Sequence, residues 1–161
     1  MIKCILENGR ETSFRHVTVG AIALNEKQEV LLVKRAQSLT RGNTYTLPGG
    51  FLDRDEDLKE GALRELKEET GYDGRIEFLF QINDSPKRPK EDRQNVDFVF
   101  IVKIVGGEME LNQEVTDIKW FSKESLPSEE NFAFDHRVII LHYFEYLKKS
   151  FTLPIIGQAN L

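Results

Sequence analysis

The sequence predicts one layered domain of the α/β or α+β class, in which strands form a sheet that helices cover. Its 161 residues suit a single ordinary domain, and 40% of them are hydrophobic while 30% are charged, as in soluble globular proteins. Short apolar runs of strand character are interleaved with two segments of helical periodicity. The sequence contains no internal repeat, linker or low-complexity tract, so we expect a single domain over residues 1–161.

The first strands are expected between residues 16 and 47. The run from His16 to Leu24 reads HVTVGAIAL, and Val30 to Val33 resumes this β-branched, apolar character after a polar stretch, which predicts a hairpin. A short strand is predicted over residues 44–47. Pro48 and the pair of glycines that follows should end it, because glycine permits backbone conformations that other residues avoid.

A charged segment from Asp55 to Thr70 predicts the first helix. Its apolar positions recur at helical spacing and are Leu58, Ala62, Leu63 and Leu66. These positions fall on one arc of about 140° around the helix axis, so this face should pack on the core. Gly71 supplies a natural stop at the C-terminal end of the helix.

Three further strands are predicted, over residues 76–82, 95–105 and 116–121. The second of them is apolar on both faces, so it should not lie at the edge of the sheet. An ordered loop that contains Pro86 and Pro89 joins the first two strands, and a turn at Gly106 and Gly107 follows the second.

Two helical segments are expected near the C-terminus. Residues 122–126 predict a single helical turn that is capped by Ser122. Asp135 is expected to cap a last helix that continues to about Lys149.

Charge and composition exclude several classes of partner. The net charge of −5 argues against general nucleic-acid binding, which requires a basic surface, although a local cluster of arginines or metal ions could still bind a small anion. The single cysteine, Cys4, excludes an internal disulfide and a cysteine-rich zinc site. No signal peptide and no apolar run of about 20 residues is found, so we expect a cytoplasmic protein that does not enter membranes.

Three carboxylates of the predicted helix, those of Glu65, Glu68 and Glu69, share one flank beside its apolar arc. Like charges at this spacing repel, and partial burial of ionised carboxylates adds to the cost. Divalent cations would compensate them, because Mg²⁺ takes oxygen ligands and keeps positions for waters and phosphates. The alternative is a solvated acidic helix with ion pairs such as Glu60 with Arg64, which helical geometry alone favours.

The wider pattern reverses that preference. Residues 50–72 read glycine, five residues, glutamate, seven residues, then REL, one residue, EE, one residue, glycine and tyrosine. This run resembles the Nudix box at every specified position, with tyrosine at the last position, where an aliphatic residue is common. The resemblance implies a Nudix-type α/β/α sandwich with a mixed β-sheet, and the flanking strands, the TDIKWF segment and the last helix fit that layout.

The resemblance also implies roles for individual residues. The implied ligands of Mg²⁺ or Mn²⁺ are Glu65, Glu68, Glu69 and the backbone carbonyl of Gly49. Arg64 is implied to pair with carboxylates of the box and to orient them, rather than to form an ordinary surface ion pair. Glu56 would be an outer ligand or a partner of Arg64. Gly50 and Gly71 are read as backbone requirements, one for a tight loop and one for the end of the helix.

The implied reaction is attack on phosphorus by a water that the metal ions activate. It needs a general base, for which Glu68 and Glu114 are the candidates. Glu114 precedes the predicted strand that contains Trp120, where members of the family often supply an acidic residue. The alternative is that Glu114 is an ordinary surface residue of a polar stretch.

The box indicates the chemistry but not the substrate. Pro86 follows Gly71 by fifteen residues and is similar to a downstream proline of the ADP-ribose-hydrolysing branch. The run FAFDH, which ends at His136, is also similar to ADP-ribose-related members. Each has an ordinary alternative, namely a proline in a polar loop and a surface or capping histidine.

Candidate substrate contacts lie outside the helix. The arginines that could meet phosphate or ribose groups are Arg15, Arg35, Arg88 and Arg93. The aromatic residues that could stack on a base are Tyr45, Phe51 and Phe132. Solvated arginines and aromatic residues packed in the core are the alternatives.

Three functions are compatible with these features. The first is hydrolysis of a nucleoside diphosphate derivative, best represented by ADP-ribose cleaved to AMP and ribose 5-phosphate. The second is a house-cleaning triphosphatase for damaged nucleotides such as 8-oxo-dGTP. The third is a non-catalytic sensor of ADP-ribose, against which the complete set of box carboxylates argues. A homodimer is left open, since many relatives are dimers and both terminal segments are apolar.

Overall fold

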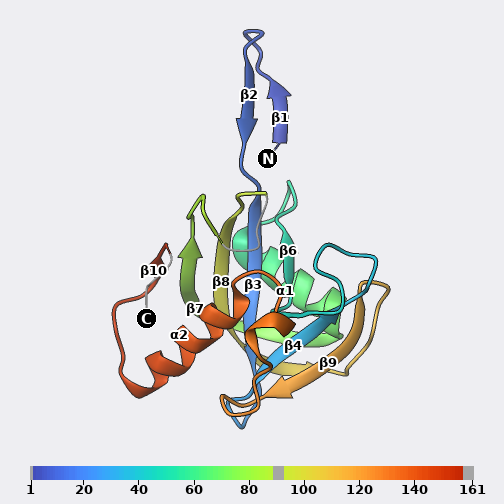
Figure 1. The fold of residues 1–161 in the computed structure, drawn as a ribbon, viewed down its shortest axis with the longest axis vertical. Helices are drawn as coiled ribbons and strands as arrows, with labels where there is room; N and C mark the ends of the chain where they lie inside the picture. Colours follow the sequence, from blue (N-terminus) through green and yellow to red (C-terminus); the bar gives the residue numbers. More distant parts are fainter. Residues whose placement is uncertain (1, 89–92, 158–161) are drawn as a thin grey trace.

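The computed structural model describes residues 2–88 and 93–157, which form a mixed sheet between two α-helices (Figure 1). In chain order the elements are β1 (Ile2–Ile5), β2 (Glu11–Phe14), β3 (Val17–Leu24), β4 (Val30–Arg35), β5 (Tyr45–Thr46), β6 (Gly49–Phe51), α1 (Leu58–Thr70), β7 (Tyr72–Asn83), β8 (Val96–Gly107), β9 (Val115–Phe121), a 3₁₀ helix (Glu129–Asn131), α2 (His136–Lys148) and β10 (Ile155–Ile156). None of the helices in this part of the chain is long and apolar enough to span a lipid bilayer.

The main sheet has the strand order β10-β7-β8-β3-β4-β5, with β6 paired to β3 and β9 paired to β4. β8 lies between β7 and β3, which confirms that this apolar strand is internal. β3 runs parallel to β8 along its whole length, whereas β7 and β8 are antiparallel. The sheet is therefore mixed, as expected.

The predicted hairpin of β3 and β4 forms only at its closed end. The two strands pair at Leu24 and Val30 and then separate, because β4 continues along β9 while β3 pairs with β6. The segment of β5 and β6 enters the space between them, where the Ala21 amide donates to the Pro48 carbonyl at 2.9 Å. This separation places backbone of three strands around one opening.

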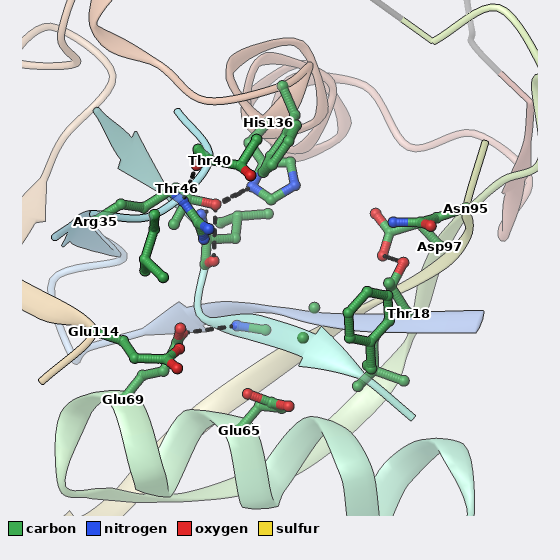
Figure 2. A pocket seen from close by; sticks show the side chains of 18 of the residues that line it. Thr18, Arg35, Thr40, Thr46, Glu65, Glu69, Asn95, Asp97, Glu114 and His136 are labelled. Atoms are coloured by element: carbon green, nitrogen blue, oxygen red, sulfur yellow. Dashed lines mark hydrogen bonds between the residues drawn. The ribbon is translucent and has the colours of Figure 1, made fainter. Parts of the chain in front are cut away.

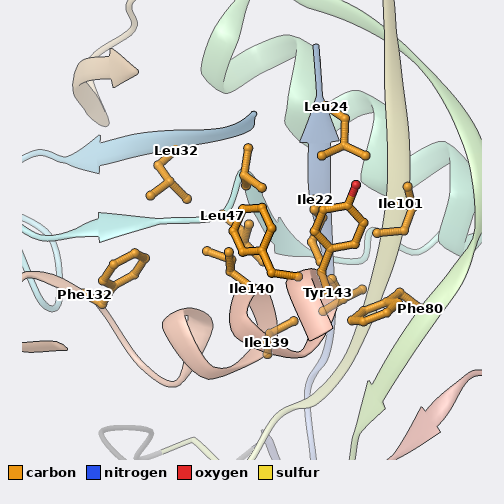
Figure 3. Packing of buried hydrophobic residues seen from close by; sticks show 13 residues of the cluster. Ile22, Leu24, Leu32, Leu47, Phe80, Ile101, Phe132, Ile139, Ile140 and Tyr143 are labelled. Carbon is orange, nitrogen blue, oxygen red and sulfur yellow. The ribbon is translucent and has the colours of Figure 1, made fainter. Parts of the chain in front are cut away.

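The core has two parts, one on each face of the sheet. Alternate residues of β3 and β4 point to opposite faces, as the two-residue period of a strand requires. Ala21, Ala23, Leu31 and Val33 pack with Ala62 and Leu66 of α1. On the other face the cluster under α2 contains Ile22, Leu24, Val30, Leu32, Ile139, Ile140 and Tyr143 (Figure 3). The α/β/α sandwich is therefore confirmed.

Helix α1 begins three residues later than predicted. Asp57 is its N-cap and accepts from the amides of Lys59 and Glu60, while the Glu60 carboxylate accepts from the Asp57 amide. This capping box satisfies amides that have no partner within the helix, so the charged residues before it stay in a loop. Gly71 ends the helix with a φ of 76°.

The C-terminal half differs from the prediction at three points. Strand β8 continues through the two glycines that were predicted to form a turn, and Gly107 pairs with Tyr72. The expected helical turn over residues 122–126 is a hydrogen-bonded turn, in which the Ser122 amide donates to the Ser125 hydroxyl at 2.9 Å. Asp135 occupies the N-cap position of α2, but its carboxylate makes no capping hydrogen bond.

Candidate active site

A cleft of about 840 Å³ lies where β3 separates from β4 (Figure 2). Strands β3 and β6, helix α1, the loop before β9 and the start of α2 contribute to it. The sequence-predicted site residues that line it are Arg35, Gly49, Gly50, Phe51, Glu65, Glu68, Glu69, Arg88, Arg93 and Glu114. Residues up to 118 positions apart, at Thr18 and His136, therefore meet in one opening.

Glu69 is the most deeply buried carboxylate of the α1 flank, with a relative exposure of 6%. Its carboxylate accepts a hydrogen bond of 3.0 Å from the amide of Gly49 (Figure 2). Burial raises the pKa of Glu69 to about 8, and the nearby charges of Glu65 and Glu114 act in the same direction. An added Cβ at Gly49 would collide with the Val19 carbonyl, so glycine allows β6 to approach β3 this closely.

Glu65 lies against the backbone of Gly50. An added Cβ at Gly50 would overlap with the Glu65 carboxylate, so this glycine leaves the space that the carboxylate occupies. Burial raises the pKa of Glu65 as well, against the opposing effect of Arg64. The ionised form of this flank is therefore disfavoured until a positive charge offsets it.

Arg64 holds the loop and the helix of the motif together. Its guanidinium donates to both Glu56 oxygens, at 2.8 and 2.9 Å, and to Glu65 and Glu68 at 3.0 and 3.1 Å. A further hydrogen bond of 3.0 Å reaches the Phe51 carbonyl. The hydrogen bonds from Arg64 lower the pKa of Glu56 to about 2.

The donor set of the α1 flank suits a hard divalent cation. Carboxylate and carbonyl oxygens are the ligands that Mg²⁺ and Mn²⁺ prefer, and a cation would favour the ionised forms of Glu65 and Glu69. Across residues 2–88 and 93–157, no three acidic, histidine or cysteine side chains already converge as closely as a bound ion would hold them. The carboxylates of Glu65 and Glu68 form ion pairs with Arg64. Their side chains would have to rotate for both carboxylates to bind the same metal ion.

Glu114 faces the α1 carboxylates from the loop before β9 (Figure 2). Asn112 fixes this loop: its side-chain amide donates to the Glu68 carbonyl at 2.7 Å, and its side-chain oxygen accepts from the Glu114 amide at 2.8 Å. The Glu114 carbonyl accepts from the amide of Ala36 at 2.8 Å. Glu114 is thus a fixed part of the cleft wall, and Asn112 was not singled out from the sequence.

Two arginines lie over aromatic rings in the cleft wall. The Arg35 guanidinium is 5.6 Å from the centre of the Phe134 ring and donates to the Thr40 carbonyl at 2.9 Å. The Arg93 guanidinium is 5.4 Å from the centre of the Phe51 ring. Phe51 is 40% exposed, which leaves ring surface for a ligand. Each pair combines a positive charge, which suits phosphate groups, with a flat apolar surface, which suits a nucleotide base.

Other predicted contacts lie elsewhere. Arg15 donates to the carbonyls of Gln94 and Asn95 and does not line the cleft. Phe132 is buried in the core under α2, and the Tyr45 hydroxyl donates to Asp117 at 3.0 Å outside the cleft. Neither Phe132 nor Tyr45 lines this cleft, so the structure gives no support to the stacking role expected of them.

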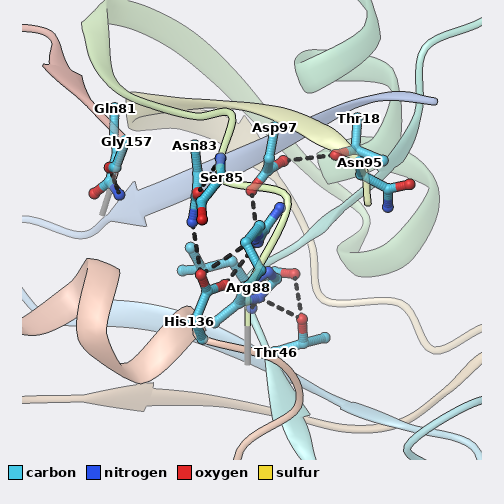
Figure 4. Close-up of polar contacts among 12 residues, drawn as sticks. Thr18, Thr46, Gln81, Asn83, Ser85, Arg88, Asn95, Asp97, His136 and Gly157 are labelled. Carbon is cyan, nitrogen blue, oxygen red and sulfur yellow. Dashed lines mark hydrogen bonds and ion pairs between the residues drawn. The ribbon is translucent and has the colours of Figure 1, made fainter. Parts of the chain in front are cut away.

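Arg88 is buried in an ionic network in the wall of the cleft (Figure 4). Its guanidinium donates to Asp135 at 2.6 and 3.2 Å and to Asp97 at 3.4 Å. The side-chain amide of Asn83 also donates to Asp135, at 2.6 Å, and the Thr18 hydroxyl donates to Asp97 at 2.9 Å. These contacts explain why the Asp135 carboxylate is not available to cap α2.

Comparison with known proteins shows the family. A model of the NUDIX domain matches residues 14–143. The chain is 32% identical over 134 residues to the ADP-ribose pyrophosphatase of Methanocaldococcus jannaschii, which covers 83% of this chain and 76% of that protein. It is 32% identical over 112 residues to the human 8-oxo-dGDP phosphatase NUDT18, covering 67% of this chain and 32% of that protein. The crystal structure of a NUDIX hydrolase from Nitrosomonas europaea superimposes with a TM-score of 0.79 at 25% identity, over 99% of this chain and 94% of that chain.

Proposed function

Because this chain belongs to the Nudix family, we propose that it hydrolyses ADP-ribose to AMP and ribose 5-phosphate with Mg²⁺ or Mn²⁺ at the α1 carboxylates. The chain is a Nudix pyrophosphohydrolase, an enzyme that cleaves the diphosphate of a nucleotide derivative. The observation that carries the proposal is that the four carboxylates of Glu65, Glu68, Glu69 and Glu114 line one cleft together with three arginines. The substrate is supported by the similarity to an ADP-ribose pyrophosphatase over most of both chains.

The metal ions would be held by Glu65, Glu68 and Glu69, with the Gly49 carbonyl as a further oxygen donor. Divalent ions, when bound, lower the pKa of water and stabilise the charge that develops on phosphate oxygens. Arg64 would keep the carboxylates in place through its hydrogen bonds to the loop and the helix. The role of Arg64 is thus positioning.

Glu114 is the proposed general base. It approaches from a different element than the α1 carboxylates, and Asn112 holds its loop in place. Glu68, the other candidate, is engaged by Arg64 at 3.1 Å and is assigned to the metal. In the reaction the water oxygen bonds to phosphorus, its proton passes to the base, and the bridging P–O bond breaks to release two monophosphates.

Arg35 and Arg93 are the proposed contacts to the substrate phosphates. Both line the cleft and both would supply positive charge in an otherwise acidic site. Phe51 would stack on the base, since its ring is exposed in the cleft. Arg88 is proposed to shape the cleft wall rather than to bind the phosphates, because Asp135 and Asp97 engage its guanidinium.

A substrate panel with product identification tests the proposal. Purified protein with Mg²⁺ is assayed on ADP-ribose, other nucleoside diphosphate derivatives and 8-oxo-dGTP. ADP-ribose should give AMP and ribose 5-phosphate in equal amounts, and it should have the highest kcat/KM. Binding of ADP-ribose without hydrolysis of any compound in the panel would instead indicate a sensor.

A second candidate is the hydrolysis of oxidised nucleotides. It is favoured by the similarity to the human 8-oxo-dGDP phosphatase, although the alignment covers only 32% of that protein. Its signature is distinct, since 8-oxo-dGTP would yield a monophosphate and pyrophosphate. A kcat/KM for 8-oxo-dGTP above that for ADP-ribose would select this function.

We propose a homodimer in the cytoplasm as the working form, with no nucleic-acid or membrane partner. The β1–β2 hairpin supports the dimer, because it stands away from the main sheet (Figure 1) and exposes Ile5 by 70% and Phe14 by 51%. Two-stranded hairpins are marginally stable alone in water. Light scattering should give about twice the chain mass of 18.6 kDa, and Ile5→Lys should shift it toward the monomer.

The single cysteine supports a reducing compartment.

A further inference from the structure

His136, the first residue of α2, lines the cleft without a role in the proposed reaction. Its Nδ1 accepts a hydrogen bond of 3.1 Å from the Leu47 amide and lies 2.7 Å from the Thr46 hydroxyl. Both partners come from the segment of β5 and β6, about 90 residues earlier in the chain. Figure 2 shows the imidazole on the opposite side of the cleft from Glu65.

The Leu47 amide determines which ring nitrogen carries the proton. A backbone amide can only donate, so Nδ1 must be unprotonated, and the single proton of the neutral ring resides on Nε2. Within the described residues Nε2 makes no hydrogen bond to the protein. His136 therefore offers one N–H group on the side of the ring away from Thr46.

The segment that leads into His136 is held at two points. Asp135 is fixed by Arg88 and Asn83 in the buried network (Figure 4). Two residues earlier the Ala133 amide donates to the Tyr45 carbonyl at 2.8 Å. A donor in a rigid frame binds an acceptor without paying the cost of ordering its own side chain.

We infer that His136 is a substrate-recognition residue whose Nε2–H donates to an oxygen or nitrogen acceptor on the sugar or base beyond the cleaved diphosphate. This inference rests on the proposed function. The phosphates must lie near the α1 carboxylates, so a donor across the cleft meets a part of the substrate that does not react. Such a contact is made equally in the ground state and the transition state, and its loss raises KM rather than lowering kcat.

The test separates the two ring nitrogens. In His136→Asn the side-chain oxygen can still accept from the Leu47 amide, but no donor remains at the position of Nε2. We expect KM for ADP-ribose to rise about tenfold with kcat within about twofold, as loss of one buried hydrogen bond predicts. His136→Gln, which places an amide N–H near Nε2, should recover most of this loss. His142→Asn is the matched control, because His142 faces Gln81 at 3.4 Å and does not line the cleft.

Competitive inhibition by the two products locates the acceptor. In His136→Asn, weaker inhibition by AMP alone places the acceptor on the nucleoside, and weaker inhibition by ribose 5-phosphate alone places it on the terminal sugar. An unchanged KM in His136→Asn overturns the inference. So does a variant in which inhibition by AMP and by ribose 5-phosphate weakens equally and kcat is lowered as well.

The inference and the proposed function can fail separately. If the wild type binds ADP-ribose but does not hydrolyse it, the proposed function fails, and the Kd of ADP-ribose in the same variants decides the role of His136. If the wild type hydrolyses ADP-ribose and His136→Asn has an unchanged KM, only the inference fails. If the wild type does not hydrolyse ADP-ribose and binds neither ADP-ribose nor its products AMP and ribose 5-phosphate, the proposed function and the inference both fail.

Discussion

Arg64 and Glu56 form a two-pronged ion pair, with hydrogen bonds of 2.8 and 2.9 Å that join helix α1 to the loop before it. Arg64→Lys keeps the charge but cannot reproduce the planar fork. We expect the free energy of unfolding to fall by about 2 kcal/mol, as for other hydrogen bonds between charged groups. We also expect kcat to fall about tenfold or more, since the α1 carboxylates lose their support.

Arg75→Lys is the control for this substitution. Arg75 pairs with Glu77 at 2.8 Å, but its side chain is 64% exposed and lies on β7 outside the cleft. Exposed pairs of this kind contribute little to stability. Chemical unfolding and steady-state kinetics on both variants would contradict the prediction if Arg64→Lys behaved like Arg75→Lys.

Glu68 and Glu114 should respond differently to metal concentration. Glu68→Gln removes charge from the proposed metal flank, so activity should fall at least about a hundredfold and recover in part at high Mg²⁺. Glu114→Gln removes the proposed base, and its loss of about a hundredfold should persist at every Mg²⁺ concentration. Rates measured over a range of Mg²⁺ concentrations decide the assignment. Glu77→Gln is the control, because Glu77 lies outside the cleft. A near wild-type rate in Glu68→Gln would reject the metal site.

The parts of the site that depend on local spacing could be predicted from the sequence. The flank of Glu65, Glu68 and Glu69 follows from helical geometry, and the boundary at Gly71 follows from its conformational freedom. Strand β8 was identified as internal because it is apolar on both faces. These features depend on residues that are close in the sequence.

The parts that depend on long-range packing were missed. Gly49 and Gly50 have low intrinsic strand propensity and form β6 only because β3 offers an edge for pairing. His136 meets Thr46 across 90 positions, and no local pattern indicates that contact. The Asp135 carboxylate would cap α2 by local rules, but a buried arginine 47 positions away engages it instead.

Metal ions should stabilise the folded protein. Glu65 and Glu69 have raised pKa values because of burial, and a bound cation would offset their repulsion. Mg²⁺ at about ten times its Kd should add about 1.4 kcal/mol to the free energy of unfolding, which raises Tm by several degrees. Glu69→Gln should remove most of this increase. Thermal melts with EDTA and with millimolar Mg²⁺ measure it, and an equal Tm in both would contradict the site.

His136 should make stability depend on pH between about 4 and 6.5. Burial lowers the pKa of His136 from 6.5 to about 4; Asp135 opposes this shift, whereas Arg88 and Arg35 add to it. The unfolded chain takes up the proton near pH 6.5, while the folded chain does so only near pH 4. Between these values the unfolded state binds more protons, so the free energy of unfolding falls as the pH is lowered. Urea unfolding of metal-free protein at about pH 7 and pH 5 should show a smaller fall in His136→Asn than in the wild type. The same fall in both proteins would mean that His136 titrates normally, and His142→Asn controls for the loss of a histidine from the same helix.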